Sequence, residues 1–173
     1  MAALGAAPVA QGQEQVLLTE FMAANTRSLP DRDRERSDWI ELYNAGSKAA
    51  NLEGWFLTDD RSRLNKWALP ASTLAPNEFL IVFASKKDRR QPGAELHTNF
   101  KLEASGGYLA LVRPDGKTIA TEYSYPRQIA NVAYGLDMAD RNSVLLNATQ
   151  PRRWLVPNRL PKVSCASNEE GNL

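Results

Sequence analysis

The chain has 173 residues, which is enough for one domain with a sizeable hydrophobic core. Its 21 lysines and arginines nearly balance its 20 aspartates and glutamates, so net charge provides no general attraction to nucleic acid or to an anionic membrane. One cysteine, Cys165, excludes an internal disulfide, and no apolar run reaches the roughly 18 residues that a membrane helix needs.

The two ends of the chain differ in composition from its middle. Residues 1–14 are rich in alanine and glycine, and they fit either a disordered leader or the remnant of a secretory signal with small residues near Ala10. The lack of a basic start favours the leader. From residue 137 to residue 173 prolines and charges interrupt small apolar islands, which predicts a weakly ordered extension or linker. We therefore expect one folded domain over residues 15–136.

The first strand-like run covers residues 16–23. Val16 and Leu18 alternate with Leu17, but the alternation then places Glu20 on the side of Leu18 and Phe21 on the other side. Neither face is purely apolar, which predicts a strand near the edge of a sheet.

Residues 38–44 carry the clearest strand pattern. Ile40 and Leu42 fall on one face, while Trp39 and Glu41 fall on the other, as in a strand half-buried in a sheet.

A tight reversal is predicted directly after this strand. Asn44 and Gly46 both tolerate positive φ, and the apolar run of residues 51–60 follows. We expect this run to return beside residues 38–44, so that the other strands add to this pair.

The remaining strand patterns lie at residues 66–70, 78–84, 96–102, 108–112, 118–123 and 131–135. The run at 78–84 is the most continuously apolar and predicts a central strand covered on both faces. Asp115-Gly116 predicts the tip of a hairpin. Short strands separated by frequent turns, without a convincing amphipathic helix, predict an all-β, antiparallel β-sandwich.

Two charged segments separate these strands. Acids alternate with arginines over residues 31–36, but the glycine of a calcium loop is missing, so a solvated loop paired with itself is the preferred interpretation. The basic cluster Lys86, Lys87, Arg89 and Arg90 could contact an anion or phosphate. Because no aromatic residue is interleaved with these charges, a solvated loop is favoured there too.

Residues with chemical potential are few. His97 is the single histidine, which excludes a site with several histidines. An esterase- or nuclease-like enzyme would have to use it with Asp59 and Asp60, and a structural role is the preferred interpretation. Glu20 and Glu41 could join the same two aspartates in a carboxylate cluster if the strands bring them together. We predict no catalytic residue, metal or cofactor.

Three aromatic residues offer an alternative function. If Trp55, Trp67 and Tyr108 lay exposed in a row, they would form a platform on which sugars stack. Burial in the core is the commoner fate of such side chains, and it would exclude this platform.

Several motifs in order resemble the lamin tail domain family. They are Leu18-Thr19-Glu20-Phe21-Met22-Ala23-Ala24-Asn25, Asp38-Trp39-Ile40-Glu41-Leu42-Tyr43-Asn44, Leu52-Glu53-Gly54-Trp55-Phe56-Leu57-Thr58-Asp59-Asp60, Phe79-Leu80-Ile81-Val82-Phe83-Ala84-Ser85, Leu96-His97-Thr98-Asn99-Phe100-Lys101-Leu102 and Gly107-Tyr108-Leu109-Ala110-Leu111-Val112. The resemblance spans about residues 15–135 and implies an immunoglobulin-like β-sandwich without catalytic residues.

The resemblance is to the bacterial branch of the family, which occurs in exported and surface proteins beside other domains. It implies a non-catalytic interaction or scaffold module, outside the cell or at its surface. Its expected partners are other protein domains or cell-surface polymers rather than nucleic acid. A carbohydrate- or polymer-binding sandwich is the alternative, and the sequence leaves the ligand and the oligomeric state open.

Overall fold

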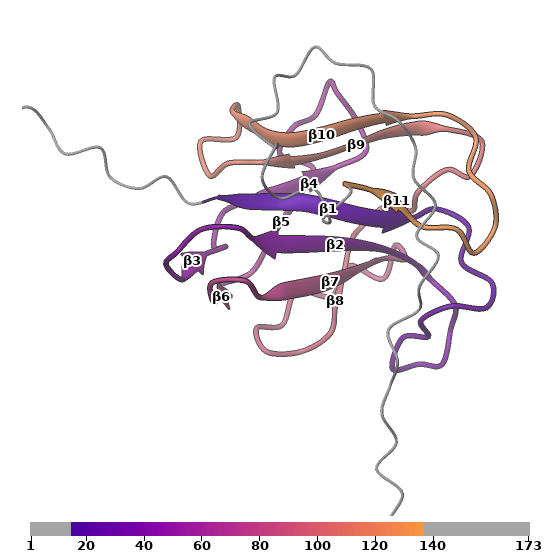
Figure 1. Ribbon diagram of the computed structural model, residues 1–173, viewed down its shortest axis with the longest axis horizontal. Coiled ribbons are helices and arrows are strands. Elements are labelled where there is room, and N and C mark those ends of the chain that lie inside the picture. The colour runs from indigo at the N-terminus through magenta and orange to yellow at the C-terminus, as the bar shows by residue number, and fades with distance from the viewer. Residues whose placement is uncertain (1–14, 137–173) are drawn as a thin grey trace, which may run out of the picture.

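A computed structural model describes residues 15–136 of the chain, and these residues contain eleven strands and no helix (Figure 1). The strands are β1 (Val16–Met22), β2 (Asp38–Asn44), β3 (Ala50–Asn51), β4 (Phe56–Thr58), β5 (Trp67–Ala68), β6 (Thr73–Leu74), β7 (Phe79–Ala84), β8 (Leu96–His97), β9 (Gly107–Val112), β10 (Ile119–Tyr125) and β11 (Tyr134–Gly135). The predicted leader and extension, residues 1–14 and 137–173, lie outside the described residues.

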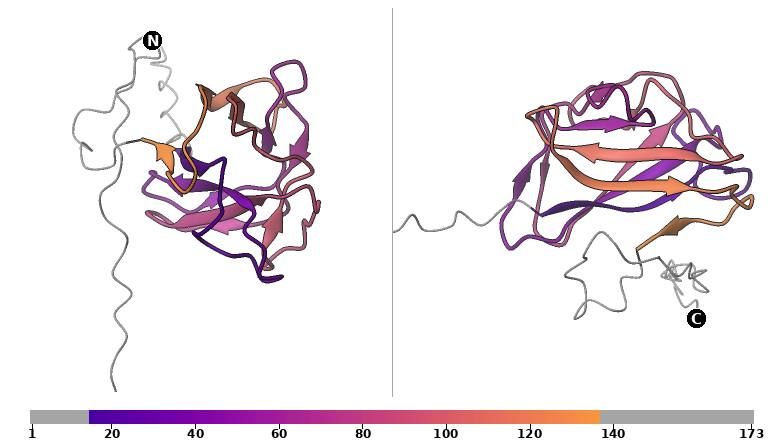
Figure 2. Two further views of the ribbon diagram at one scale, coloured as in Figure 1. Left: turned by 90° about the vertical axis from the view of Figure 1, so that its right-hand side faces the viewer. Right: turned by 90° about the horizontal axis from the view of Figure 1, so that it is seen from above.

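Two sheets face each other and enclose the core. One has the strand order β11-β1-β2-β7-β8 and the other β10-β9-β4-β5, while β3 and β6 form a separate pair. Every pairing is antiparallel except that of β7 with β8. The two layers are seen from above in the right panel of Figure 2. The predicted immunoglobulin-like β-sandwich is therefore confirmed.

Strand β1 contains a bulge that the sequence pattern did not reveal. The register against β2 shifts between Leu18 and Glu20, so Thr19 is the extra residue. Val16, Leu18 and Phe21 consequently all lie in the core, although strict alternation places Phe21 on the opposite face from Leu18. The mixed faces predicted from the sequence were a sign of this bulge.

The predicted pairing of residues 38–44 with residues 51–60 is wrong. β2 pairs with β1 and β7, whereas β4 lies in the other sheet between β5 and β9. The chain crosses between the sheets, and Leu52 and Trp55 on this crossing are fully buried. Alternation predicts which face of a strand is buried, but it contains no information about the neighbouring strand.

Two other strands differ from the prediction, β7 in its burial and the strand predicted at 96–102 in its length. β7 does lie between β2 and β8, but Phe79 at its start is 45% exposed, so only its second half is covered on both faces. Of the strand predicted at 96–102, only Leu96–His97 forms one. Beyond it, the Thr98 hydroxyl donates to the carbonyl oxygen of Phe100 at 2.7 Å and turns the chain.

The hairpin between β9 and β10 is as predicted. Gly116 has a φ of 67°, which glycine adopts without strain. The Asp115 carboxylate accepts hydrogen bonds from the backbone N–H groups of Lys117 and Thr118, at 2.9 and 2.8 Å.

Contacts between β1 and β10 close one side of the sandwich. The Tyr123 hydroxyl donates to the Leu18 carbonyl oxygen at 3.0 Å. The Phe21 ring packs against the rings of Tyr123 and Tyr125, with centroid distances of 5.5 and 4.8 Å. Phe21 therefore joins the two sheets where they come together.

The last described strand returns to the first. β11 pairs with β1 opposite Glu20 and Phe21, and the Leu136 N–H donates to the Thr19 carbonyl oxygen at 2.7 Å. Because this pairing is antiparallel, β11 runs back along β1 (Figure 1), and the described chain ends at Leu136 beside Thr19, in the middle of β1.

Replacing Phe21 by alanine should lower the free energy of unfolding by about 3–5 kcal/mol, because it opens a cavity among fully buried side chains. Phe79→Ala is the matched control, since this ring is 45% exposed, and its effect should stay below about 1 kcal/mol. Urea denaturation followed by tryptophan fluorescence measures both. Equal losses in the two variants would contradict the assigned position of Phe21.

Candidate functional site

A cation at the centre of three carboxylates joins two loops of the sandwich. Lys87, in the loop after β7, places its Nζ 2.5 Å from Asp31 Oδ2, 2.6 Å from Asp33 Oδ2 and 2.9 Å from Glu35 Oε2. The three acids belong to the loop between β1 and β2. Asp31 is the most protected of them, because its side chain has no exposed surface. We call these four residues the Lys87 clasp.

Local backbone structure prepares the acidic loop for this contact. The Glu35 N–H donates to Asp31 Oδ1 at 2.8 Å, and the Arg34 N–H donates to the Asp31 carbonyl oxygen at 2.9 Å. Arg34 itself has a φ of 65°, which tightens the turn. The turn orients Asp31 toward the protein, where the Ser37 hydroxyl is a further donor at 3.2 Å.

The protonation equilibria of the clasp reflect these contacts. Burial alone would raise the pKa of Asp31, but the hydrogen bonds from Lys87 and from the Glu35 N–H lower it below its usual value. Hydrogen bonds from Lys87 and Arg89 lower the pKa of Asp33 to about 2. The same acids outweigh the effect of burial on Lys87 and raise its pKa.

The clasp corrects the prediction of two independent solvated loops. The acids of residues 31–36 pair with Lys87 and Arg89 of the other loop rather than with their own arginines. Arg90 pairs with Asp88 at 2.8 Å, so of the basic cluster only Lys86 lacks an ion pair within residues 15–136. The charge pattern predicted two loops, but it contained no sign that they pair with each other.

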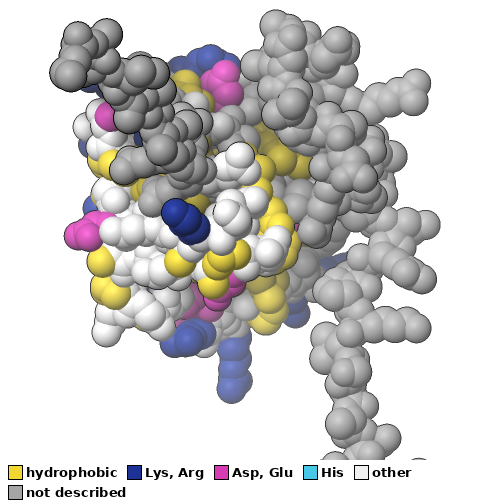
Figure 3. All heavy atoms as spheres, turned by 60° about the vertical axis from the view of Figure 1, so that its left-hand side comes forward, with side chains coloured by type: hydrophobic (Ala, Val, Ile, Leu, Met, Phe, Trp, Pro, Cys, Tyr) yellow, Lys and Arg dark blue, Asp and Glu magenta, His cyan; other side chains and the backbone are white. Residues whose placement is uncertain are grey.

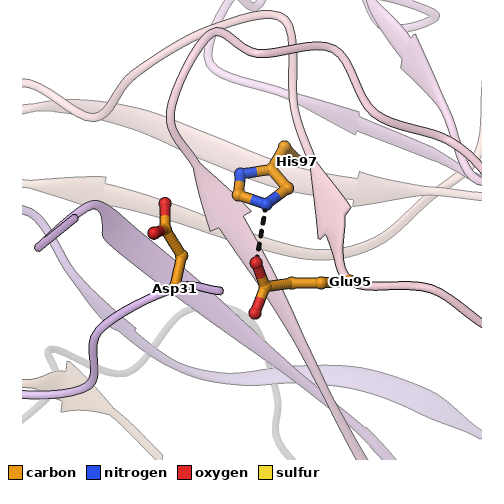
Figure 4. Close-up of side chains that lie close together, drawn as sticks. All are labelled: Asp31, Glu95 and His97. Carbon is orange, nitrogen blue, oxygen red and sulfur yellow. Dashed lines mark hydrogen bonds and ion pairs between the residues drawn. The ribbon is translucent and has the colours of Figure 1, made fainter. Parts of the chain in front are cut away.

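His97 lies beside the clasp and is fully buried. Its Nδ1 is 2.8 Å from Ser85 Oγ, and its Nε2 is 2.9 Å from Glu95 Oε1. Its ring stacks on Phe83 with a centroid distance of 5.4 Å. Asp31 completes the group, and one ligand-type atom from each of Asp31, Glu95 and His97 lies within 4.8 Å of the others (Figure 4).

The enzyme hypothesis based on His97 with Asp59 and Asp60 is wrong. Both nitrogens of His97 are engaged by Ser85 and Glu95. Asp59 pairs instead with Lys66 at 2.5 Å, and Asp60 accepts from the Ser62 hydroxyl at 2.7 Å. The residues are therefore committed to separate contacts.

Ser85, His97 and Glu95 have the composition of a hydrolase triad, but their burial differs from one. The His97 ring has no exposed surface and Ser85 is only 8% exposed, whereas a catalytic base has to come within hydrogen-bond reach of a substrate. Neither residue type nor spacing distinguishes Ser85 and Glu95 in the sequence, so these two partners of His97 were not predicted. The arrangement satisfies a buried histidine and joins β7 to β8.

A polar hollow of about 240 Å³ opens next to Ser85, at the end of the five-stranded sheet. It is lined by Glu35, Arg36, Ser37, Asp38, Ala84, Ser85 and Lys101. Burial raises the pKa of Asp38, against the hydrogen bond from the Asn25 N–H. The Arg36 guanidinium is directed at the carbonyl oxygens of Arg27 and Ser28, and thus serves its own loop.

The proposed aromatic platform does not exist. Trp55 and Trp67 are fully buried, and Tyr108 is 9% exposed. The Arg61 guanidinium carbon lies 4.4 Å from the centroid of the Tyr108 ring, and the Tyr108 hydroxyl donates to Glu122 at 2.8 Å. Trp55 and Trp67 pack in the main core, whereas Tyr108 packs with Ala110 and Val112 in a separate apolar cluster, so the three rings form no exposed row.

The predicted carboxylate cluster forms only in part. Glu20 and Glu41 are direct neighbours on β1 and β2, whereas Asp59 and Asp60 follow β4 of the other sheet. Burial and, secondarily, the charge of Glu41 raise the pKa of Glu20 to about 7. Burial also raises the pKa of Glu41, against the hydrogen bond from the Thr19 hydroxyl at 2.8 Å.

These features define a β-sandwich module whose polar centre connects loops and strands. The family model described as Lamin Tail Domain matches residues 10–127, well over half of the chain. The chain therefore belongs to the lamin tail domain family, as the sequence motifs indicated. Searches of curated proteins and of solved structures gave no match. Within residues 15–136, no helix is present that could span a membrane.

The Lys87 clasp predicts a strong contrast between two adjacent lysines. Lys87→Met leaves Asp31 buried without a cation and should lower the free energy of unfolding by about 2–3 kcal/mol at pH 7. Lys86→Met is the control, since Lys86 is exposed and forms no ion pair within the described residues, and its effect should stay within about 0.5 kcal/mol.

The pH dependence of the stability difference between Lys87→Met and Lys86→Met follows from the lowered pKa values of Asp31 and Asp33. Folded-state pKa values below the ordinary 3.8 mean that the acids stabilise the fold above that value and lose their contribution as the pH falls through the folded values. The difference in the free energy of unfolding between the two variants should therefore shrink as the pH falls from about 4 to about 2. A constant difference across this range would rule out the ionic origin.

Glu20→Gln should have the opposite pH signature. Its folded-state pKa of about 7 lies above the ordinary value of 4.5, so the stabilisation from Glu20 is complete below pH 4.5 and falls as the pH rises through 7. At pH 8 the glutamine variant should unfold with a free energy about 1–2 kcal/mol higher than the parent, with no gain at pH 4. Glu53→Gln, at an exposed position, is the control, and an equal gain there would refute the explanation.

Proposed function

We propose that this chain is a non-catalytic interaction module of a bacterial extracellular or cell-surface protein, where it joins or spaces other protein domains or contacts surface polymers. One observation carries the non-catalytic part. The nitrogens of His97 contact Ser85 and Glu95, and Asp31 pairs with Lys87, so the residues best suited to chemistry hold two loops in place. Membership of the lamin tail domain family supports the same conclusion.

The exposed basic residues beside the Lys87 clasp are the preferred contact surface. Lys86, Arg89 and Arg90 are exposed on a loop whose backbone is held by the buried residues beneath it. A loop fixed by a rigid scaffold is a common position for binding residues. Arg89 and Arg90 are already paired with Asp33 and Asp88, so this surface presents both charge signs to a partner.

Mixed charge favours a protein partner over nucleic acid. The formal net charge of the whole chain is only +1, and on the face shown in Figure 3 basic, acidic and hydrophobic side chains are interspersed. Nucleic-acid binding relies on a continuous basic surface that releases counterions. The extracellular location rests on the resemblance to the bacterial, exported branch of the family.

The carbohydrate-binding alternative has lost the residues that suggested it. Trp55 and Trp67 contribute to the core, and Arg61 covers the Tyr108 ring. No other observation favours this alternative.

A binding and turnover panel tests the proposal. The purified chain should hydrolyse no ester, phosphodiester or glycoside, and it should bind neither double-stranded DNA nor neutral polysaccharides at low or high salt. Turnover that disappears in a Ser85→Ala variant would overturn the non-catalytic assignment. DNA binding that weakens with salt and with Lys86→Met would instead assign the basic loop to nucleic acid.

A second arm of the same experiment tests the location and the contact surface. On intact cells that make the full-length protein, a membrane-impermeant amine cross-linker should reach Lys86 and join it to a protein or surface polymer. The Lys86→Met variant should lose that adduct, whereas a variant at Lys117, on the β9–β10 hairpin, should keep it. Labelling only after cell lysis would contradict the extracellular location.

A further inference from the structure

Asp31 and the pair Glu95 and His97 come from two segments far apart in the sequence and converge on one buried point (Figure 4). Asp31 follows β1, Glu95 precedes β8, and His97 is the last residue of β8. The side chains of Asp31 and His97 have no exposed surface, and that of Glu95 is 18% exposed. An imidazole and two carboxylates within 4.8 Å are a donor set that divalent transition metals prefer.

The charges around this point do not balance. The acids of the cluster are Asp31, Asp33, Glu35 and Glu95. Lys87 and Arg89 are the cations that pair with them, so two negative charges remain when His97 is neutral. Within the described residues, the arginines of the acidic loop form no ion pair with these acids. A divalent cation would supply the missing charge.

Each of the three donors also has a further hydrogen-bond partner. Ser85 Oγ contacts His97 Nδ1 at 2.8 Å, on the side of the ring opposite Nε2. The Glu35 N–H binds Asp31 Oδ1 at 2.8 Å, and the Arg32 N–H binds Glu95 Oε1 at 2.9 Å. Hydrogen bonds of this kind orient metal ligands and fix the histidine tautomer.

We propose that Asp31, Glu95 and His97 bind one divalent transition-metal ion of the zinc class. His97 supplies Nε2 and donates its Nδ1 proton to Ser85 Oγ, while Glu95 and Asp31 each supply one oxygen. Ligand atoms of a tetrahedral zinc site lie about 3.3 Å apart, so the 2.9 Å distance between His97 Nε2 and Glu95 Oε1 opens slightly on binding. Lys87 gives up Asp31 and keeps Asp33 and Glu35.

The role of this site is structural. The ion cross-links the loop after β1 to β8, at a place closed to substrates, and it stabilises the loop that carries the exposed basic residues. Metal binding then adds to the stability of the fold in proportion to the logarithm of the ion concentration over its dissociation constant.

The test uses the full, untagged chain in a Cys165→Ser background, because a thiolate is itself a zinc ligand. After treatment with a chelator, calorimetric titration should show one equivalent of Zn²⁺ bound, and Co²⁺ should develop the visible absorption of a tetrahedral complex. Glu95→Gln and Asp31→Asn should weaken binding at least about tenfold. Asp33→Asn is the matched control, since Asp33 pairs with Lys87 but is not a proposed ligand, and it should leave the affinity within about twofold.

A second measurement uses the chain with all three proposed ligands intact, so it does not depend on whether the ligand variants fold. His97 is the single histidine of the chain, so the imidazole NMR signals report on it directly. Zn²⁺ should shift these signals in step with the calorimetric titration, whereas Mg²⁺ should not. Unchanged imidazole signals at one equivalent of Zn²⁺ would overturn the proposal, as would binding that persists in both ligand variants.

Discussion

A buried carboxylate requires a cation, and in this domain Asp31 obtains its cation from a distant part of the chain. The Asp31 side chain is inaccessible to solvent, and Lys87 Nζ lies 2.5 Å from it across 56 positions of sequence. An unpaired charge in such a place would be strongly destabilising, so the two loops have to meet. Their meeting fixes the path that leads to Glu95 and His97, and hence the polar centre next to the five-stranded sheet.

The parts of the fold that the sequence predicted well are those governed by local patterns. Alternation in β2 and the Asp115-Gly116 turn each depend on neighbouring residues, and both formed as expected. The apolar run of β7 formed a strand as expected, although only its second half is covered on both faces. The family motifs added the sandwich architecture. The errors concerned partners far apart in the sequence, as in the assumed pairing of β2 with β4.

The polar centre was less predictable for the same reason. His97 was identified as the one histidine, but its partners Ser85 and Glu95 are ordinary residues without a distinctive spacing. The interpretation of residues 31–36 as paired with themselves used the correct charges and the wrong partners. The aromatic residues were unpredictable for another reason. A tryptophan such as Trp55 can form a binding surface or fill a core, and the residue type alone does not distinguish the two. Only the tertiary structure separates these cases.

The pairing of β11 with β1 ends the described domain beside Thr19, three residues along β1 from its first residue, Val16. A domain with this geometry can be inserted into a surface loop of a host protein without forcing the two host segments apart. Tension applied at Val16 and Leu136 would separate the β1–β11 hydrogen bonds one after another, because this pairing is antiparallel. β1 pairs with β11 at two positions but with β2 at six. The last described strand would thus yield under load before the sandwich itself does.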